Sequence, residues 1–472
     1  MNGSLKTKCL NVVVAVGVLF ALGFSVVSGQ VQDASQNPRP DERFKADILL
    51  VVAHPDDETA VFRYLAKAVL DEKKRVAVVY TTRGDGGGNE IGSERSSSLG
   101  MIREIEARRG LAAFGIQNVW FMDGRDVLSQ NPLSSLANGQ HARLLEQLVR
   151  TFRLTRPEVV LTWLPALAGD HGGHQASGIL ATEAFDASGD PTVFPAQVTA
   201  RTRDFEPMFE GLRPWQAKKL YFFTDSLCLD LKGKAVEYSN QEISPSRKVT
   251  YEYLAGTEAS YHLTQEDNKP FADAMAKGEL DKYLQKATSV LGFSVFPNPV
   301  RLLLGKTHVK IGPQDEVFAG ISNEPIPFVF SRSPQSPQQT GVVIELGGPW
   351  GFYPNFWKFH GLEGLERLSE KRIYISAGEK LEVPLLLRNA TSGSKQVSLR
   401  LKTKLPEGWN EETRASRFLI DAGDAYPVNI SIATPAKPSD IWYGLEYSIE
   451  IDGREVSAVV LKVQLVRGTI PQ

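Results

Sequence analysis

The sequence from residue 48 to residue 58 is Ile-Leu-Leu-Val-Val-Ala-His-Pro-Asp-Asp-Glu, and the architecture of the chain can be worked out from it. Its first six residues, Ile48–Ala53, are apolar without polar alternation, which is typical of a strand buried on both faces of a parallel sheet. Because Pro55 cannot continue a ladder, the strand is predicted to end at His54. Open α/β sheets bind ligands at the carboxyl ends of their strands. The polar residues that follow are therefore predicted to lie at a ligand site.

His54, Asp56 and Asp57 are residue types that serve as metal ligands and as general bases. Neighbouring Asp side chains point in different directions, so one can bind a metal while the other faces a bound water. The alternative is that Asp56 or Asp57 caps a helix that is predicted to begin near Glu58. The His beside the pair, directly behind an apolar strand, favours the site.

A second polar cluster, Asp170-His171-Gly172-Gly173-His174, follows the strand-like run Val159–Trp163. The chain has only 7 His in 472 residues, and three of them fall in these two motifs. On their own, His171 and His174 would more often be surface-loop histidines than metal ligands. Together with His54 and Asp57 it favours a divalent metal site. Two His and one carboxylate also occur in non-haem iron sites, so the spacing does not separate zinc from iron.

The stretch Ala53–Glu58 resembles the signature of the PIG-L/LmbE-like de-N-acetylase family. Members of this family are zinc-dependent enzymes that remove acetyl groups from N-acetylglucosamine-containing molecules. The resemblance implies Zn2+ as cofactor, with Fe2+ or another divalent ion as the alternative. Carried over residue by residue, the resemblance implies that the metal ligands are His54, Asp57 and His174. It also implies that Asp56 is the base and that His171 steadies the oxyanion or protonates the leaving amine.

Further family-like segments follow in the same order. Thr82–Gly87 resembles the family's substrate loop, and Arg103 with Glu106 resembles its Arg-x-x-Glu helix. Ser260–Gln265 resembles a later His-x-Ser-Gln element. The resemblance implies that three residues contact the substrate: Arg83, Asp85 and Arg103. The alternative for each of them is a surface ion pair.

The sequence departs from the family pattern at two positions. Asp85 stands where the family usually has Glu, and Gly173 stands where many members carry an Asp beside the ligand His. Asp170 is the candidate to supply that missing carboxylate, which in metal sites orients the ligand His.

Apolar runs alternate with helical stretches from residue 45 onwards, which predicts an α/β domain over residues 45–290 with a Rossmann-like, mostly parallel sheet and flanking helices. The expected strands are Ile48–Ala53, Arg75–Tyr80, Val119–Met122, Val159–Trp163 and Lys219–Phe223, the last of which is expected to close the sheet. The expected helices are Glu58–Leu70, Glu94–Phe114, Gln140–Phe152 and His174–Phe185.

The C-terminal part changes to short β-type runs, and Asp452-Gly453 is a strong hairpin turn. This pattern predicts an all-β, immunoglobulin-like sandwich over residues 371–472, joined by a connecting region at 291–370. Leu405–Trp409 resembles a motif of small sandwich domains attached to bacterial glycoside-active enzymes. That resemblance implies glycan contact by this domain, with a structural spacer as the alternative.

The N-terminus has the pattern of an export signal, with two Lys before the apolar run Leu10–Val27 and small residues after it. We expect a signal peptide at residues 1–29, a leader at 30–44 and a periplasmic or extracellular protein. The alternative is an uncleaved anchor, because such a run is just long enough to span a bilayer core of ~30 Å. The formal net charge is -2 with both signs dispersed, so nucleic acid is not expected as a partner.

Together these features predict an exported metal-dependent hydrolase that removes an acetyl group from an N-acetylglucosamine-type amino sugar or glycoconjugate. Two alternatives stay open at this point. One is an amidase that acts on a non-sugar N-acyl substrate, and the other is a non-catalytic glycan-binding protein.

Overall fold

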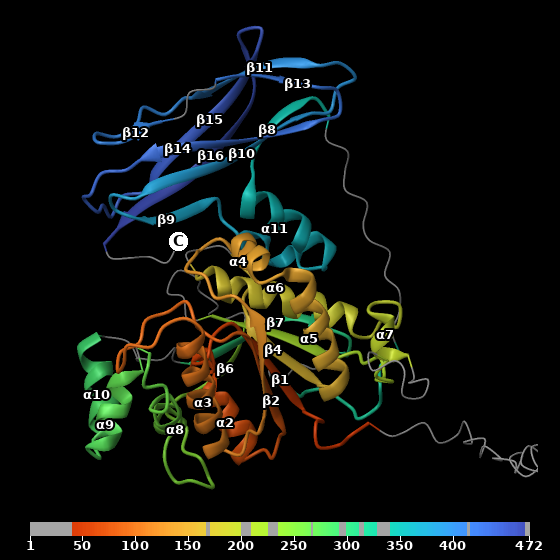
Figure 1. Cartoon of the computed structure of the whole chain (residues 1–472), viewed down its shortest axis with the longest axis vertical. Coiled ribbons are helices and arrows are strands. Elements are labelled where there is room, and N and C mark those ends of the chain that lie inside the picture. The colour runs from red at the N-terminus through yellow and green to blue at the C-terminus, as the bar shows by residue number, and fades with distance from the viewer. Residues whose placement is uncertain are drawn as a thin grey trace, which may run out of the picture. The chain divides into compact units, whose positions relative to one another are not determined.

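A seven-stranded sheet forms the centre of the N-terminal half of the chain (Figure 1). The computed structural model describes residues 40–166, 170–199, 209–224, 235–265, 268–291, 299–310, 316–327, 340–412 and 416–467. The predicted signal peptide and most of the leader lie outside these residues. The strands are β1 (Ile48–Val52), β2 (Val76–Thr82), β3 (Asn118–Gly124), β4 (Val159–Trp163), β5 (Lys219–Phe223), β6 (Val236–Tyr238) and β7 (Val300–Thr307). Their order is β3-β2-β1-β4-β5-β7-β6, which confirms the predicted mostly parallel α/β fold.

The strand order reverses direction between β1 and β4. Ile48 of β1 is paired with Val76 of β2 on one side and with Val159 of β4 on the other, both in parallel. Such a reversal is the topological switch point at which open α/β sheets bind ligands. The two polar motifs follow β1 and β4, so both arise at this point of the sheet.

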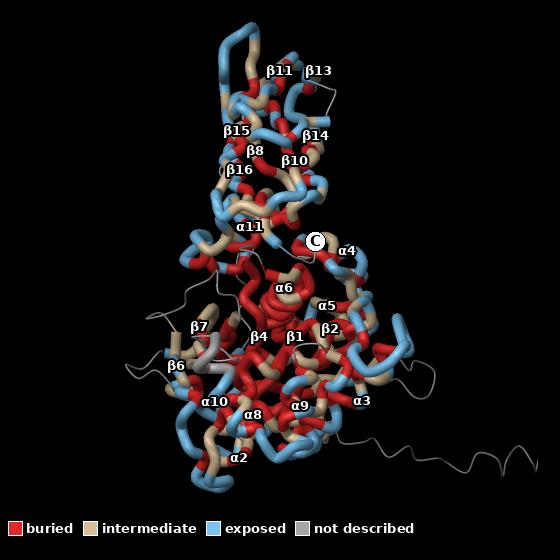
Figure 2. Tube along the Cα trace, turned by 90° about the vertical axis from the view of Figure 1, so that its left-hand side faces the viewer, coloured by how far each residue is buried: buried red, intermediate tan, exposed pale blue. Residues whose placement is uncertain are grey.

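Strand β1 is buried on both faces, as its apolar sequence predicts. Leu49 and Val51 belong to one hydrophobic cluster, while Ile48, Leu50 and Val52 belong to another. Figure 2 shows the buried residues gathered along β1, β4 and α6. Burying a Val, Leu or Ile side chain fully stabilises the fold by about 1.5–3 kcal/mol, so this strand anchors both layers of helices.

Helices cover both faces of the sheet. One face carries α4 (Pro132–Asn138), α5 (His141–Thr155) and α6 (Gly172–Ala187). The other carries α2 (Phe62–Leu70), α3 (Ser97–Ala113), α8 (Tyr251–Ala259), α9 (Lys269–Ala276) and α10 (Leu280–Leu291). Two short elements complete this part, the 3₁₀ helix η1 (Asp57–Ala60) and α7 (Pro195–Val198).

The expectation that Lys219–Phe223 closes the sheet is wrong. Strand β7 pairs with β5 in antiparallel orientation, and β6 pairs with β7 beyond it. Strand β7 comes from the stretch 291–370, which was expected only to connect the two domains. The βα alternation could not indicate this pairing, because an antiparallel strand that returns from far along the chain has no local signal.

The C-terminal strands form two sheets, as predicted for a β-sandwich. One has the order β12-β14-β10-β8 and the other β13-β11-β15-β16-β9. All pairs are antiparallel except β16 with β9. The strands are β8 (Val342–Leu346), β9 (Arg372–Ser376), β10 (Lys380–Asn389), β11 (Lys395–Leu401), β12 (Asn410–Glu411), β13 (Arg417–Ile420), β14 (Ala425–Ala433), β15 (Tyr443–Ile451) and β16 (Arg454–Val466).

Local details of the sandwich bear on two expectations. Asp452 and Gly453 have φ values of 51° and 74°, as a two-residue hairpin turn with both central residues at positive φ requires. Trp409 of the proposed glycan motif is buried and packs edge-on against Tyr443, with ring centroids 5.2 Å apart. It therefore serves the core of the sandwich, and glycan contact by this domain stays a prediction.

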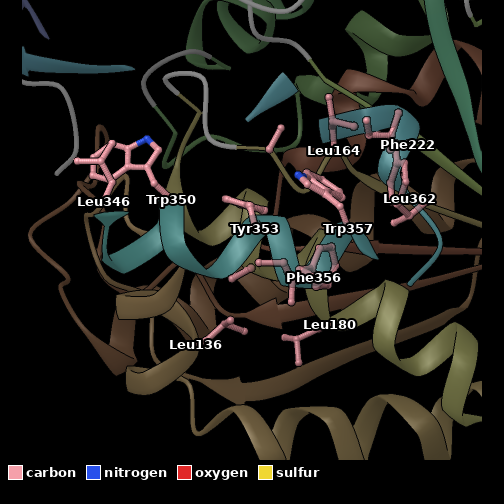
Figure 3. Packing of buried hydrophobic residues seen from close by; sticks show 14 of the residues in the cluster. Leu136, Leu164, Leu180, Phe222, Leu346, Trp350, Tyr353, Phe356, Trp357 and Leu362 are labelled. Carbon is pink, nitrogen blue, oxygen red and sulfur yellow. The ribbon is translucent and has the colours of Figure 1, made fainter. Parts of the chain in front are cut away.

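Helix α11 (Gly348–Phe359), followed by the 3₁₀ helix η3 (Glu363–Leu368), packs against the α/β layer. Figure 3 shows its aromatic side chains above residues of α4 and α6. Tyr353, Phe356 and Trp357 share one hydrophobic cluster with Leu136 of α4 and Leu180 of α6. The same cluster continues into the sandwich, so α11 joins the two cores.

None of the helices in the described part of the chain is both long and apolar enough to cross a bilayer. The apolar run Leu10–Val27, on which the expectation of export or anchoring depends, lies outside the described residues.

Asp71, which follows α2, ties the segment before α8 and the first residue of α8 to the end of α2. Its carboxylate accepts hydrogen bonds from the Ser244 hydroxyl (2.7 Å), the Ser246 amide (3.0 Å) and the Tyr251 hydroxyl (2.8 Å). Burial raises the pKa of Asp71, but these donors outweigh it and lower the pKa from 3.8 to about 2.

Replacing Asp71 by Asn is expected to lower the free energy of unfolding near neutral pH by roughly 1–2 kcal/mol, after allowance for solvent screening. Because the folded-state pKa lies below the ordinary value, the carboxylate stabilises the fold above about pH 4 and stops doing so as the pH falls through about 2. Denaturant unfolding of both proteins across this range should show their difference shrinking in acid. A difference that is independent of pH would contradict the assignment.

Candidate metal centre

Asp57 is the central residue of the site, and its two carboxylate oxygens have separate tasks. Oδ2 accepts hydrogen bonds from the amides of Ala53 (2.8 Å) and His54 (3.0 Å) and from the indole of Trp163 (2.8 Å). Oδ1 faces two imidazoles, at 3.5 Å from Nδ1 of His54 and 3.2 Å from Nε2 of His174. Asp57 therefore does not cap the following helix, and its free oxygen points at the two predicted ligand His.

The distances from Oδ1 of Asp57 to these two imidazole nitrogens fit two ligand pairs of one small cation, and His54, His171 and His174 form a group whose nitrogen atoms lie within 4.8 Å of one another. Ligand atoms bound tetrahedrally to zinc at about 2.0–2.2 Å lie about 3.3–3.6 Å from one another. Burial raises the pKa of the Asp57 carboxyl, but His174 and His54 together hold it well below its usual range. Asp57 is therefore ionised, as a metal ligand must be. The donor set of two imidazoles and one carboxylate suits zinc and other divalent transition metals.

Each of the two predicted ligand His has a carboxylate on its other ring nitrogen. Nε2 of His54 lies 3.1 Å from Oδ1 of Asp126, and Nδ1 of His174 lies 2.9 Å from Oδ1 of Asp170. The ring of His174 also stacks on Trp163 at 4.1 Å with an interplanar angle of 4°. Carboxylates in these positions fix the tautomer and orientation of metal-binding His. Asp170 thus makes the contact for which the sequence suggested it.

The neighbouring carboxylates raise the pKa values of His54 and His174. Burial lowers the pKa of His54, but Asp126 and Asp57 raise it to about 10. Burial also lowers the pKa of His174, but Asp57 and Asp170 raise it well above its ordinary value. The cluster therefore favours positive charge between these residues, which a cation could supply in place of the protons.

His171 is held as a neutral hydrogen-bond donor. It is the N-cap of α6, and its Nδ1 accepts a hydrogen bond from the Gly173 amide at 3.1 Å. An accepting Nδ1 places the ring proton on Nε2. Burial, followed by the positive charges of His54 and His174, lowers the pKa of His171 to about 3. Of its two predicted roles, this geometry favours donating a hydrogen bond to an oxyanion over protonating an amine.

Gly173 is closely surrounded at this turn. A Cβ on Gly173 would lie 3.0 Å from Nδ1 of His171 and 3.0 Å from Nε2 of His54. A side chain at this position would therefore require one of the two rings to shift by a few tenths of an ångström. In this chain the carboxylate beside His174 comes from Asp170.

Asp56 has a strained backbone that its neighbours hold in place. Its φ of 143° lies in the region that L-residues rarely adopt and that costs about 1–3 kcal/mol. The Asp56 amide donates to Oε2 of Glu58 (3.0 Å), and Asn268 donates to Oδ2 of Asp56 (3.2 Å). Gln265 donates to the carbonyl of Pro55 (2.8 Å). Strain of this kind is found at functional residues whose surroundings over-determine them.

The Asp56 carboxyl is easier to protonate than an ordinary Asp. Burial and then the negative charge of Asp57 raise its pKa to about 7. Its side chain accepts a hydrogen bond from Asn268, in a different segment of the chain. The Asp56 side chain makes no hydrogen bond to the start of the following helix, so it does not act as a helix cap. Asp56 is therefore a carboxylate placed beside the donor set but with a separate hydrogen-bond partner.

The segment Ser260–Gln265 packs directly behind the acidic motif. Nε2 of His262 lies 3.1 Å from Oε1 of Glu58 and 3.1 Å from Oε1 of Glu258, and all three side chains are fully buried. These three residues also form a group of potential metal-binding side chains. The imidazole pairs with both carboxylates, and burial together with the negative charge of Glu58 raises the pKa of Glu258 to about 7. We interpret the group as support for the turn that carries Asp56.

The predicted substrate residues lie in or against the Gly-rich loop within Thr82–Gly88. They are not among the predicted metal ligands. Arg103 is buried and donates to the carbonyls of Gly84 (2.5 Å) and Gly88 (2.8 Å), so it organises the loop. Arg83 pairs with Glu104. Asp85 accepts a long hydrogen bond of 3.4 Å from the Asp126 amide, which places the loop next to the site.

Asp126 and Trp163 were not identified from the sequence as site residues. Asp126 follows β3 by two residues, and Trp163 is the last residue of β4. Both lie at the carboxyl ends of parallel strands, so the rule that located the His-Pro-Asp-Asp motif could have found them. A lone Asp in a loop and a Trp at the end of an apolar strand carry no other signal.

Comparisons with known proteins agree with this location. Residues 49–185 match the family model described as "PIG-L: GlcNAc-PI de-N-acetylase". The 1D-myo-inositol 2-acetamido-2-deoxy-alpha-D-glucopyranoside deacetylase of Thermobifida fusca is 26% identical over 189 residues, which cover 37% of this chain and 60% of that protein. A protein of the same name from Frankia alni is 29% identical over 187 residues, covering 36% and 59%. The match therefore spans about three fifths of these relatives.

Solved structures are also similar to this chain, at low sequence identity. The N,N'-diacetylchitobiose deacetylase from Pyrococcus horikoshii has 17% sequence identity and a TM-score of 0.36, and the alignment covers 55% of this chain and 84% of that chain.

Proposed function

We propose, from the match of residues 49–185 to the PIG-L family model, that the protein is a metal-dependent hydrolase that removes an acetyl group from an N-acetylglucosamine-type amino sugar or glycoconjugate. The observation that carries the proposal is the convergence of three donor atoms, Oδ1 of Asp57, Nδ1 of His54 and Nε2 of His174, at the switch point of the sheet. The relatives named as deacetylases support the reaction class.

His54, Asp57 and His174 would hold the metal ion, for which we propose Zn2+. A divalent ion held there would supply a Lewis acid that lowers the pKa of a water to about 7 and polarises an acyl carbonyl. A set of three protein ligands is typical of catalytic rather than structural zinc sites.

Two other residues would handle the proton and the developing charge. Asp56 takes the proton from the attacking water and delivers a proton to the departing amine. The Nε2–H of His171 donates to the acyl oxygen as it becomes negative, which stabilises the tetrahedral intermediate. Their positions are fixed by Asn268, which donates to Asp56, and by Gly173, whose amide occupies Nδ1 of His171.

Export stays part of the proposal and rests on the sequence of residues 1–29. The N-terminal mass of the protein recovered from its producing cell checks it. A mature N-terminus near Gln30 is expected, and an intact Met1 on protein that stays with the membrane would favour the anchor instead.

The proposed activity predicts acetate release that depends on the metal. The mature protein is incubated with N-acetylglucosamine, its oligomers, inositol-linked N-acetylglucosamine and a panel of non-sugar N-acyl amines, with and without chelator. We expect release only from the amino sugars, its loss with chelator and its return with added Zn2+.

The other outcomes distinguish the alternatives. Release from non-sugar amides alone would replace the sugar substrate by another acyl amide. Saturable glycan binding without any release, by protein that contains stoichiometric metal, would point to the non-catalytic protein.

A further inference from the structure

Tyr353 of α11 makes a buried hydrogen bond to the α/β layer beside the metal centre. Its hydroxyl donates to Oε1 of Gln175 at 2.7 Å, and both side chains have 0% of their surface exposed. Gln175 is the residue next to His174 near the start of α6. The contact therefore joins the segment between β8 and the sandwich strand β9 to the helix that carries one of the proposed ligands.

Gln175 passes this contact on to the turn that orients His174. Its amide nitrogen donates to the backbone carbonyls of Asp170 (3.0 Å) and Gln130 (3.2 Å). Oδ1 of Asp170 in turn accepts from the His171 amide (2.7 Å) and pairs with Nδ1 of His174 (2.9 Å). One continuous series of hydrogen bonds thus leads from the Tyr353 hydroxyl to the imidazole of His174.

The Tyr353 hydroxyl is the hydrogen-bond partner of the accepting end of the Gln175 amide. An amide has one accepting and one donating end, and the Asp170 and Gln130 carbonyls, which can only accept, face the nitrogen. Oε1 therefore faces the phenol, which donates to it. Without that donor Oε1 is left buried and unpaired, and any movement of Gln175 that relieves it loosens the turn at Asp170.

A second contact from the sandwich supports the same turn. The Gln130 side chain donates to the backbone carbonyl of Tyr374 in β9 at 3.2 Å. The carbonyl of the same Gln130 accepts from Gln175, and the carbonyl of Ser129 accepts from the Gly172 amide at 2.5 Å. Residues 129 and 130 therefore lie between the C-terminal elements and the start of α6.

We propose that Tyr353 is a positioning residue of the metal centre, which acts through Gln175 and Asp170 to hold His174 in its ligand orientation. The C-terminal extension then contributes to metal retention and is more than an appended spacer. This inference rests on the proposed metal-dependent function, since it concerns the ligand His174.

The test compares Tyr353→Phe with Tyr251→Phe in the full mature chain loaded with Zn2+. Both substitutions delete only a buried hydroxyl that donates a hydrogen bond, but Tyr251 donates to Asp71 in the other helical layer. The rate of zinc loss to a chromogenic chelator is measured together with kcat, KM and thermal unfolding. Loss of a group that orients a metal ligand typically weakens metal affinity or activity by 10–100-fold.

Tyr353→Phe is expected to release zinc about tenfold faster than wild type and to lower kcat with little change in KM. Tyr251→Phe should unfold at a lower temperature but release zinc at the wild-type rate. Asp170→Asn should also accelerate release, and adding Tyr353→Phe to it should accelerate release by less than the product of the two single effects, because both act through one series of contacts. Gln175→Met offers the same comparison if Tyr353→Phe folds poorly.

Two results would overturn the inference while leaving the proposed function intact: zinc release from folded Tyr353→Phe at the wild-type rate, or equal acceleration in Tyr251→Phe. If wild type itself retains no metal, the proposed function falls and this inference falls with it.

Discussion

Asp57→Asn is expected to abolish metal binding and, with it, acetate release, while the fold survives. Oδ2 of Asp57 accepts three hydrogen bonds, from Ala53, His54 and Trp163. In the Asn variant the single amide oxygen is expected to keep these three donors. The amide nitrogen, which cannot bind a metal, then faces His54 and His174. Removal of one of three ligands together with its negative charge leaves two imidazoles, which are too few for a stable site.

The measurement is metal content after gel filtration, together with the thermal unfolding midpoint and the rate of acetate release. Asp47→Asn is the matched control, because Asp47 lies at the other end of β1 and accepts a hydrogen bond from the Arg75 amide (2.7 Å). It should keep its metal. Stoichiometric zinc in Asp57→Asn would show that the ion is held by other residues and would remove Asp57 from the ligand set.

Asp56→Asn is expected to lower kcat by about 10²–10⁴-fold, the usual effect of losing a general acid–base group. The Asn side chain can still accept from Asn268 through its oxygen, so the geometry is kept while the capacity to take a proton is lost. Metal content and KM should stay close to wild type. Stability should be unchanged or increased, because the substitution removes a buried carboxyl from beside the negative charge of Asp57.

The separation of metal binding from turnover is what identifies Asp56 as the base. Comparing Asp56→Asn with Asp57→Asn makes this visible, since only the second should lose the ion. Parallel loss of metal in Asp56→Asn would make it a ligand instead. Full activity in a metal-loaded Asp56→Asn protein would require a different proton acceptor.

Much of the α/β fold was predictable because its signals are local. The apolar run Ile48–Ala53 has no polar face, so it indicated a strand buried on both sides, and β1 is buried throughout. The strand was predicted to end at His54, before Pro55; β1 ends two residues earlier, at Val52, and the carboxylates follow its carboxyl end as predicted. The sandwich strands alternate apolar and polar residues, and the Asp452-Gly453 turn prefers one backbone geometry, so these elements were recognisable as well.

Other features were not predictable because they depend on partners distant in the sequence. Strand β7 extends the sheet beyond Lys219–Phe223 by an antiparallel pairing that no βα alternation indicates. Arg103 is predicted to contact substrate, and its guanidinium also donates to the carbonyls of Gly84 and Gly88. Its charge alone could not indicate these backbone contacts.

The sequence by itself determined where the site lies and which residue types it contains, because strand ends, turns and motif spacing are properties of neighbouring residues. The tertiary structure decided how each atom is used. It assigns Oδ2 of Asp57 to three hydrogen-bond donors and leaves Oδ1 for the imidazoles. It brings Asp126 to His54 across 72 residues and Tyr353 to Gln175 across 178. Such contacts follow from the packing of whole layers, in which most buried polar atoms pair with whichever partner the fold brings close.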